Sequence, residues 1–163
     1  MPRPAVAFAP ASRWQTKNWP PEHFIEAGRI LNEEFGASIY LVGTEQDRAV
    51  CESIAHGIGA SAIDTSGDTS IPQLCGLLRE MDLLVSVDSG PVHIAAAVGT
   101  PVLGIYGLTD PLRTGPYGDI HRILRPVRIA GRHGDFRRPT RENLSVMRSI
   151  EPVRVVEAAR EML

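Results

Sequence analysis

The run from Asp88 to His93 carries groups that could hold a phosphorylated ligand. It follows an apolar run typical of a strand and precedes residues of helical pattern, so we expect a helix to begin there. The first amides of a helix have no partner within it, and the positive end of the helix dipole lies beside them. Ser89 could cap the helix, and Gly90 would let a ligand approach the backbone closely. The run therefore predicts an anion site.

Two side chains of this run could contact the ligand. Asp88 could accept hydrogen bonds from sugar hydroxyls, and His93 could face phosphate or sugar oxygens. An aspartate after a strand is often only a cap or turn former, and a lone histidine is more often a satisfied core residue. From spacing alone, the functional and the structural interpretation of each residue both stay open.

A second segment with polar groups runs from Pro10 to Trp19, after the first apolar run of the chain. Lys17 offers an ammonium that can neutralise a diphosphate, and Ser12 offers a hydroxyl to the same group. The alternative for Lys17 is a solvated surface lysine, but its place after a predicted strand favours binding. Glu45 follows the second apolar run, where acidic residues receive ribose hydroxyls in nucleotide-binding α/β domains. A first-turn carboxylate that complements a helix dipole is an equal alternative for Glu45.

The elements that position these segments alternate along the chain. Short apolar runs of strand length are separated by longer stretches of helical period, which is typical of successive βα units and a parallel sheet. Strands are predicted at residues 5–9, 38–42, 61–64, 83–87, 101–106 and 121–124. We therefore expect a Rossmann-like, doubly wound α/β fold, in which ligands bind beyond the carboxyl ends of the strands. Both polar segments leave the strands that usually flank that crevice, the first and the fourth.

Local signals place the helices between these strands. Gly36 should end the first helix, and Ser70 with Gln73 forms a capping box that begins the third. A closing helix begins near Glu151, with its apolar positions expected on one side at Val153, Val156, Ala159 and Met162. Ala95, Ala96 and Ala97 should let the helix after Gly90 lie tightly on the sheet. Residues 125–148 are rich in arginine and predict no element; they are a solvated loop or a contact for an acidic acceptor or phospholipid headgroups.

The composition fits one soluble globular domain. The chain has 163 residues, 43% hydrophobic and 22% charged, which is enough to bury a core unaided. Its formal net charge of -2 predicts no general attraction to nucleic acid or to an anionic membrane. The sequence has no signal-peptide pattern and no long apolar run, so we expect a cytoplasmic protein with at most peripheral contact with the inner membrane.

Other chemistries lack their motifs. There is no G-x-x-x-x-G-K-[ST] loop and no G-x-G-x-x-G fingerprint, so a P-loop NTPase or a nicotinamide dehydrogenase would lack its phosphate cradle. A G-x-S-x-G elbow is missing too. Cys51 and Cys75 fall in predicted helices without zinc-ligand spacing, so we interpret both as reduced core thiols and expect no metal.

Two stretches carry a family resemblance over essentially the whole chain. Residues 88–101, continued by residues 106–111, resemble the donor-site signature of the lipopolysaccharide heptosyltransferases, glycosyltransferase family nine. Residues 12–24, from Ser12 through Lys17 to a Trp-Pro segment, are similar to the segment after the first strand of the family's donor domain. One departure is that the chain has no cysteine after Cys75, where many relatives carry several.

The resemblance implies a GT-B glycosyltransferase built of two Rossmann-like domains. Residues 1–163 would be its C-terminal, nucleotide-sugar (donor) binding domain, and the N-terminal acceptor domain would be absent from this chain. The donor would be a nucleotide-sugar substrate, ADP-heptose, with no cofactor and no metal. The implied roles are the diphosphate for Lys17 and Ser12, the ribose for Glu45, the sugar for Asp88, and phosphate and sugar oxygens for Ser89, Gly90 and His93, with Pro91 and Val92 in the same signature.

The implied reaction transfers the heptose to a hydroxyl of a lipopolysaccharide-core-type or other glycan acceptor. Lys17 and Asp88 would stabilise the donor and the transition state, while the general base would be an aspartate of the N-terminal domain. We therefore expect the isolated chain to bind donor but to turn over poorly or not at all. The alternatives are a stand-alone nucleotide-sugar binding module without catalysis, or a fragment of another GT-B enzyme such as a nucleotide-sugar epimerase.

Overall fold

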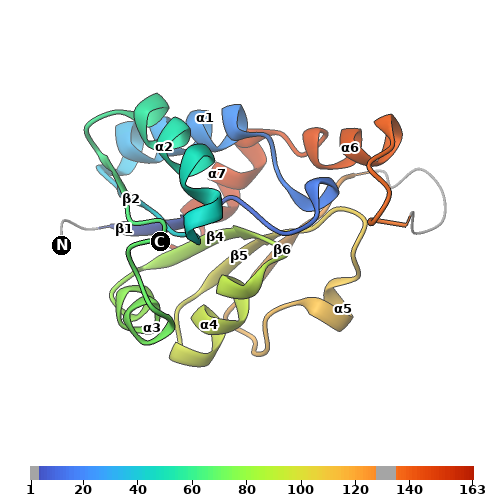
Figure 1. The fold of residues 1–163 in the computed structure, drawn as a ribbon. Helices are drawn as coiled ribbons and strands as arrows, with labels where there is room; N and C mark the ends of the chain where they lie inside the picture. Colours follow the sequence, from blue (N-terminus) through green and yellow to red (C-terminus); the bar gives the residue numbers. More distant parts are fainter. Residues whose placement is uncertain (1–3, 128–134) are drawn as a thin grey trace.

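The computed structural model, which describes residues 4–127 and 135–163, contains a six-stranded parallel sheet between two layers of helices (Figure 1). The strands are β1 (Ala5–Ala9), β2 (Ser38–Leu41), β3 (Ala62–Asp64), β4 (Leu83–Val87), β5 (Val102–Ile105) and β6 (Arg122–Leu124). Their order in the sheet is β3-β2-β1-β4-β5-β6, and every neighbouring pair is parallel. The predicted doubly wound α/β fold is confirmed, and no predicted strand boundary is wrong by more than one residue.

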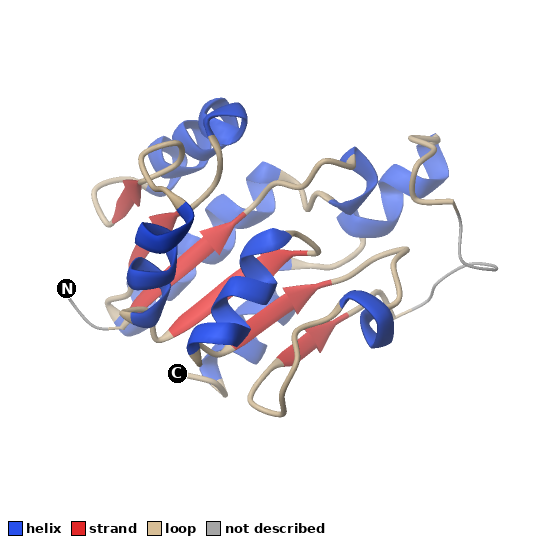
Figure 2. Cartoon of the chain, turned by 60° about the horizontal axis from the view of Figure 1, so that its bottom comes forward, coloured by secondary structure: helices blue, strands red, loops and turns tan. Residues whose placement is uncertain are grey.

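Each face of the sheet carries its own apolar core. In β1, Val6 and Phe8 belong to the core beneath α1 (Pro21–Phe35), α2 (Arg48–Ile58) and α7 (Pro152–Arg160). Ala5, Ala7 and Ala9 belong to the opposite core, against α3 (Ile71–Arg79) and α4 (Gly90–Val98), which cover the near face of the sheet in Figure 2. The side chains of a strand point alternately to its two faces, so one apolar run supplies both cores. For this reason the sequences of the central strands are almost continuously apolar, with Ser86 of β4 as an exception.

Most of the residues that were predicted to begin or end a helix do so through hydrogen bonds at the helix ends. Gly36 has φ 65°, and its amide donates to the carbonyl of Asn32, which ends α1 in a left-handed turn. The capping box of Ser70 and Gln73 is present at the start of α3, where Gln73 Oε1 accepts from the Ser70 amide at 2.9 Å. In α4, Ala95 is fully buried but Ala97 is exposed, so the prediction that all three alanines lie on the sheet is wrong for Ala97.

The apolar stripe predicted for the closing helix is wrong at one end. Val153 is 53% exposed, whereas the buried positions of α7 are Pro152, Val155, Val156, Ala158 and Ala159. The reason is the helical period of about 100° per residue, because repeated steps of three drift around the axis. Val153 and Ala159 are therefore about 120° apart around the axis, while steps of three and four from Pro152 stay on one side. Met162, beyond the end of α7, packs against the core as predicted.

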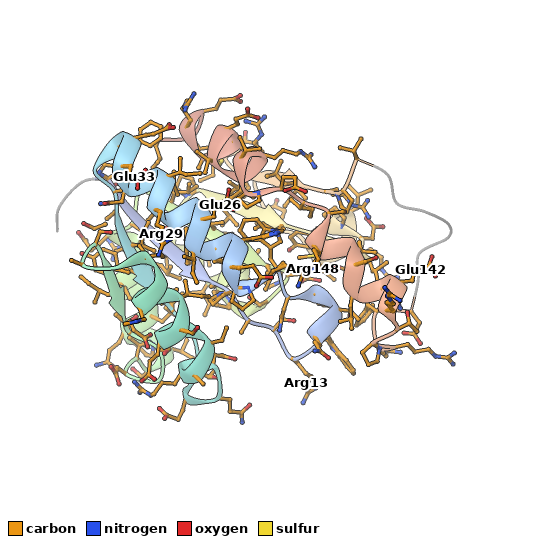
Figure 3. The ribbon with its side chains drawn as sticks, turned by 90° about the horizontal axis from the view of Figure 1, so that it is seen from above. Arg13, Glu26, Arg29, Glu33, Glu142 and Arg148 are labelled. Carbon is orange, nitrogen blue, oxygen red and sulfur yellow. The ribbon has the colours of Figure 1, made fainter. Side chains whose placement is uncertain are left out.

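The arginine-rich region contains a helix that the sequence did not reveal. α6 (Arg141–Arg148) begins after Thr140, whose side chain accepts from the Asn143 amide at 3.2 Å. In Figure 3, α6 lies beside the short 3-10 helix η1 (Gln15–Lys17). Arg148 of α6 forms an ion pair with Glu22 of α1 at 2.9 Å, so this region packs on the domain. Residues 128–134, part of the same region, lie outside the described residues. No helix in the described part of the chain is long and apolar enough to span a membrane.

Candidate functional site

A groove of ≈ 1050 Å³ opens at the carboxyl ends of β1 and β4. These strands are neighbours in the sheet, yet the chain leaves β1 towards α1 on one face and leaves β4 towards α4 on the other (Figure 1). Such a switch point is where doubly wound sheets bind ligands. Most of the predicted site residues line the groove, namely Ser12, Lys17, Glu45, Asp88, Ser89, Gly90, Pro91 and His93.

Lys17 and Asp88 meet at the centre of this groove. Lys17 Nζ lies 2.8 Å from Asp88 Oδ2, and the two side chains are only 14% and 7% exposed. Thr114 Oγ1 donates a second hydrogen bond to the same carboxylate oxygen at 3.2 Å. A desolvated ion pair needs such additional hydrogen bonds to offset the loss of water. The site therefore holds a fixed cation beside a fixed carboxylate.

The loop that carries Lys17 is held by several hydrogen bonds. Trp19 is buried, and its indole N–H donates to the carbonyl of Ile150 at 2.8 Å. Asn18 Oδ1 accepts from the Ser12 amide at 2.8 Å. The Ser12 hydroxyl donates to the carbonyl of Trp14 at 3.1 Å and accepts from its amide at 3.2 Å. A ligand that uses the Ser12 hydroxyl must therefore compete with this local turn.

The start of α4 differs from its predicted form. Ser89 does not cap the helix: among the described residues its hydroxyl donates to the Val87 carbonyl at 3.2 Å and lies 3.3 Å from Ser86 Oγ. The Val92 amide donates to the Ser89 carbonyl, and Pro91 has no N–H. Within the described ranges, the amides of Ser89 and Gly90 remain without a hydrogen-bond partner, so the anion site offers fewer donors than a full first turn.

Gly90 and Val92 lie on opposite sides of this turn. A Cβ at Gly90 would meet no atom within 4 Å, because that direction is open groove. The Val92 side chain is fully buried in the core against the sheet and does not line the groove. We therefore assign no side-chain contact with a ligand to Val92, contrary to the expectation from the signature. His93 is exposed and lines the groove.

Glu45 lies at the outer edge of the groove, at the start of the 3-10 helix η2 (Glu45–Asp47). Its carboxylate, 73% exposed, accepts from Arg48 Nε and Nη2 at 2.9–3.1 Å, and Arg48 also pairs with Asp68 at 2.9 Å. The hydrogen bonds and charge of Arg48 lower the pKa of Glu45 below its ordinary value. Glu45 therefore stays an ionised acceptor, which suits a hydroxyl-rich ligand but requires the ligand to share it with Arg48.

Thr114 lines the groove although the sequence did not single it out, and Tyr106, the first residue of the stretch that continues the signature, supports it. Tyr106 is fully buried, and its hydroxyl donates to the Thr114 carbonyl at 2.9 Å. Burial, and to a lesser extent the charge of Asp88, raise the pKa of Tyr106 above its ordinary value, so it stays a neutral donor. Thr114 ends α5 (Pro111–Thr114), which Asp110 caps by accepting from the Leu112 amide at 3.0 Å. The Asp110-Pro111 pair was a readable start signal for this helix.

Metal ligands and cysteine thiols are the remaining groups that the sequence analysis addressed. Among residues 4–127 and 135–163, no group of three or more His, Cys, Asp or Glu side chains could hold a metal ion. Both cysteines are free; Cys51 is fully buried, but Cys75 is only half-buried, so the prediction of two core thiols is wrong for Cys75. Burial raises the pKa of the Cys51 thiol to about 12.

The strand order, the switch-point groove and a partly buried lysine beside a helix start define a Rossmann-like α/β domain whose groove presents groups suited to an anionic ligand. The chain belongs to glycosyltransferase family 9 (heptosyltransferase), whose family model matches residues 1–144. The family resemblance seen in the sequence is therefore confirmed.

Individual relatives agree with this assignment. The chain is 31% identical to lipooligosaccharide heptosyltransferase 2 of Haemophilus ducreyi, over 99% of this chain and 48% of that protein. It is 26% identical to the solved ADP-heptose lipopolysaccharide heptosyltransferase II of E. coli, with a TM-score of 0.84 over 98% of this chain and 46% of that one. It shares its fold with E. coli heptosyltransferase WaaC solved with ADP, with a TM-score of 0.80, 24% identity, and coverage of 98% and 44%. The chain thus spans about half the length of these relatives.

Proposed function

We propose that this chain is the donor-binding domain of a heptosyltransferase and that its groove binds ADP-heptose. The observation that carries the proposal is the convergence of the Lys17 ammonium and the backbone amides of Ser89 and Gly90 on one groove at the switch point. A nucleoside diphosphate needs this combination of a cation and backbone donors. Family membership supports heptose as the sugar, because the similar E. coli enzyme is named for ADP-heptose.

The groove suggests an order for the ligand along its length. Glu45, at the outer edge, would accept hydrogen bonds from the ribose. Lys17, Ser12 and the amides at the start of α4 would hold the pyrophosphate in the middle. Asp88 and His93 would face the sugar and the oxygens next to it.

The chemistry of these residues is stabilisation of a leaving group. When the heptose passes to an acceptor hydroxyl, the bond from its anomeric carbon to the donor phosphate breaks, and negative charge grows on the nucleoside diphosphate. Lys17 and the α4 amides would stabilise this charge from fixed positions, which lowers the barrier without reorganisation. The acceptor hydroxyl must also lose its proton. We assign that step to the N-terminal acceptor domain that the resemblance implies.

The acceptor and the location of the protein are further proposals. The names of the relatives support a lipopolysaccharide core as acceptor, contacted mainly by the other domain. We propose that the transfer takes place in the cytoplasm, with at most peripheral contact at the inner membrane. Alone, the chain should bind donor and turn over poorly.

The test is calorimetric titration of the chain with ADP-heptose, ADP, UDP and GDP. We expect adenine nucleotides to bind most tightly, Lys17→Ala to weaken ADP and Asp88→Ala to weaken ADP-heptose, each by at least about tenfold, as loss of a desolvated charged contact requires. Arg79→Ala is the matched control, because Arg79 is exposed in the last turn of α3 and does not line the groove. Unchanged affinity in both groove variants would reject the site, and failure of every nucleotide to bind would reject the function.

A further inference from the structure

An aromatic residue outside the predicted site lies against the loop that carries Lys17. Thr16 is buried, and its hydroxyl donates a hydrogen bond to the backbone carbonyl of Phe136. The Trp14 ring meets the Phe136 ring edge-on, with centroids 5.8 Å apart and an interplanar angle of 80°. One contact therefore holds the Phe136 backbone on η1 and the other holds its ring beside the residue that precedes η1, although 120 positions separate Thr16 from Phe136 along the chain.

The Phe136 ring faces the Lys17 ammonium. Lys17 Nζ lies 4.7 Å from the ring centroid, within the range of an attractive cation–π contact, while its other close partner is Asp88 Oδ2 at 2.8 Å. The lysine side chain is 14% exposed. An ammonium has three N–H donors, and the carboxylate and the ring occupy two of its sides. The remaining side is available to the groove that Lys17 lines.

We infer that Phe136 is a positioning residue for Lys17 in pyrophosphate binding; the inference rests on the proposed function. A free lysine side chain has many rotamers and a strongly hydrated head, and both must be given up when it binds an anion. The ring limits the rotamers and removes water from one side of the ammonium before the ligand arrives. Affinity gained in this way comes from preorganisation and needs no contact between Phe136 and the ligand.

A second cation shares the ring and must be separated from this effect. The guanidinium carbon of the exposed Arg137 lies 5.4 Å from the Phe136 centroid. Loss of the ring could therefore also move Arg137. A change in ADP affinity caused by Arg137 would persist when Lys17 is replaced, whereas a change transmitted by Lys17 would disappear. Testing the Phe136 variants with and without Lys17 therefore distinguishes the two effects.

The experiment is a double-mutant cycle read out by calorimetric titration of the 163-residue chain with ADP. The variants are Phe136→Leu, Phe136→Tyr, Lys17→Met and the pair Phe136→Leu/Lys17→Met. We expect Phe136→Leu to weaken ADP about 3- to 10-fold in the wild-type background, the range of a partly desolvated cation–π contact. The same change should have no effect on ADP affinity in the Lys17→Met background. Phe136→Tyr, which keeps the ring face, should stay within about twofold of wild type.

The outcomes separate this inference from the proposed function. An equal loss in both backgrounds, or an equal loss for leucine and tyrosine, would overturn the positioning role and leave the site intact. Absence of ADP binding by the wild-type chain, or no effect of Lys17→Met, would overturn the proposed site and the inference with it. Phe136→Met, a further replacement that is apolar but has no ring, should lower ADP affinity as much as Phe136→Leu. Thermal unfolding of each variant verifies that the affinities are those of folded protein.

Discussion

Lys17 Nζ lies 2.8 Å from Asp88 Oδ2, although the two residues are 71 positions apart in the sequence. They meet because β1 and β4 are adjacent, parallel strands, so the loops that follow the two strands begin at the same edge of the sheet. The pair therefore forms only when the central strands have assembled. The pair also places the Lys17 and Asp88 charges beside the start of α4, in the groove that we assign to the ligand. The same contact therefore links the assembly of the sheet to the formation of the site.

The pair should be energetically coupled. Removing one partner of a buried ion pair leaves the other charge without compensation, so we expect Lys17→Met to lower the free energy of unfolding by about 2–4 kcal/mol. Urea denaturation of Lys17→Met, Asp88→Asn and the double variant measures this. The double variant should be clearly more stable than the sum of the two losses predicts; strict additivity would mean that the pair contributes nothing as a pair.

Thr114 should support Asp88 by the hydrogen bond from its hydroxyl to the carboxylate. Thr114→Val keeps the shape of the side chain and removes this 3.2 Å contact, so ADP-heptose should bind about 3- to 10-fold more weakly, as for loss of one hydrogen bond to a charged group. Thr114→Ser keeps the hydroxyl and is the matched control. Equal affinities for valine and serine variants in calorimetry would remove Thr114 from the site.

Gly90 should separate binding from folding. A Cβ there enters open groove and meets no atom within 4 Å outside its chain neighbours and its own helix backbone, so Gly90→Ala should change unfolding free energy by less than about 1 kcal/mol. The added methyl group occupies the space beside the amides that we assign to the pyrophosphate. ADP affinity should therefore fall by at least about tenfold. A variant that binds ADP normally would place the ligand elsewhere.

The contact between Glu45 and Arg48 should depend on pH through the ionisation of the Glu45 carboxyl group. Because Arg48 lowers the pKa of Glu45 below its ordinary 4.5, the stabilising contact is complete above that value and is lost as the pH falls through the lowered pKa. A carbon-13 NMR titration of the Glu45 carboxyl should give a midpoint below 4.5 in the wild type. In Arg48→Met, which lacks the guanidinium, the midpoint should rise, whereas Arg79→Met should leave it unchanged. A midpoint insensitive to Arg48 would show that the guanidinium is not what lowers the pKa of Glu45.

The two thiols should differ in reactivity. Cys51 is fully buried and burial raises its pKa to about 12, so almost none is thiolate near neutral pH. Cys75 is half-buried in α3. Reaction with a maleimide should modify one cysteine in the native chain, identified by mass spectrometry as Cys75, and both after unfolding in urea. Rapid native labelling at Cys51 would show that the α2 core opens.

Sequence reasoning succeeded where the determinants are local. The apolar run of β4, the capping box that begins α3 and the glycine that ends α1 each act within a few residues, so their patterns sufficed. Family membership was also visible, because the donor-site signature is contiguous. The Ser89 cap was wrong because Pro91, at the second position of α4, has no N–H to donate, and the Val92 amide donates to the Ser89 carbonyl instead.

The rest of the site depends on contacts that the sequence does not order. Thr114 reaches Asp88 across 26 positions, through a buried Tyr106 and a short helix. Phe136 reaches the η1 loop from a stretch without periodic pattern. α6 was missed because its buried face contains little more than Met147, too small an apolar stripe to distinguish a helix from a solvated loop.

A crystal structure of the chain with ADP would show directly whether the groove between Lys17 and α4 binds the pyrophosphate. We predict the pyrophosphate between the two segments, with an oxygen within hydrogen-bonding distance of Lys17 Nζ and another at the amides of Ser89 or Gly90. ADP bound with its phosphates away from both segments, for instance in a smaller groove lined by Pro21, Leu144 and Arg148, would contradict the proposed site.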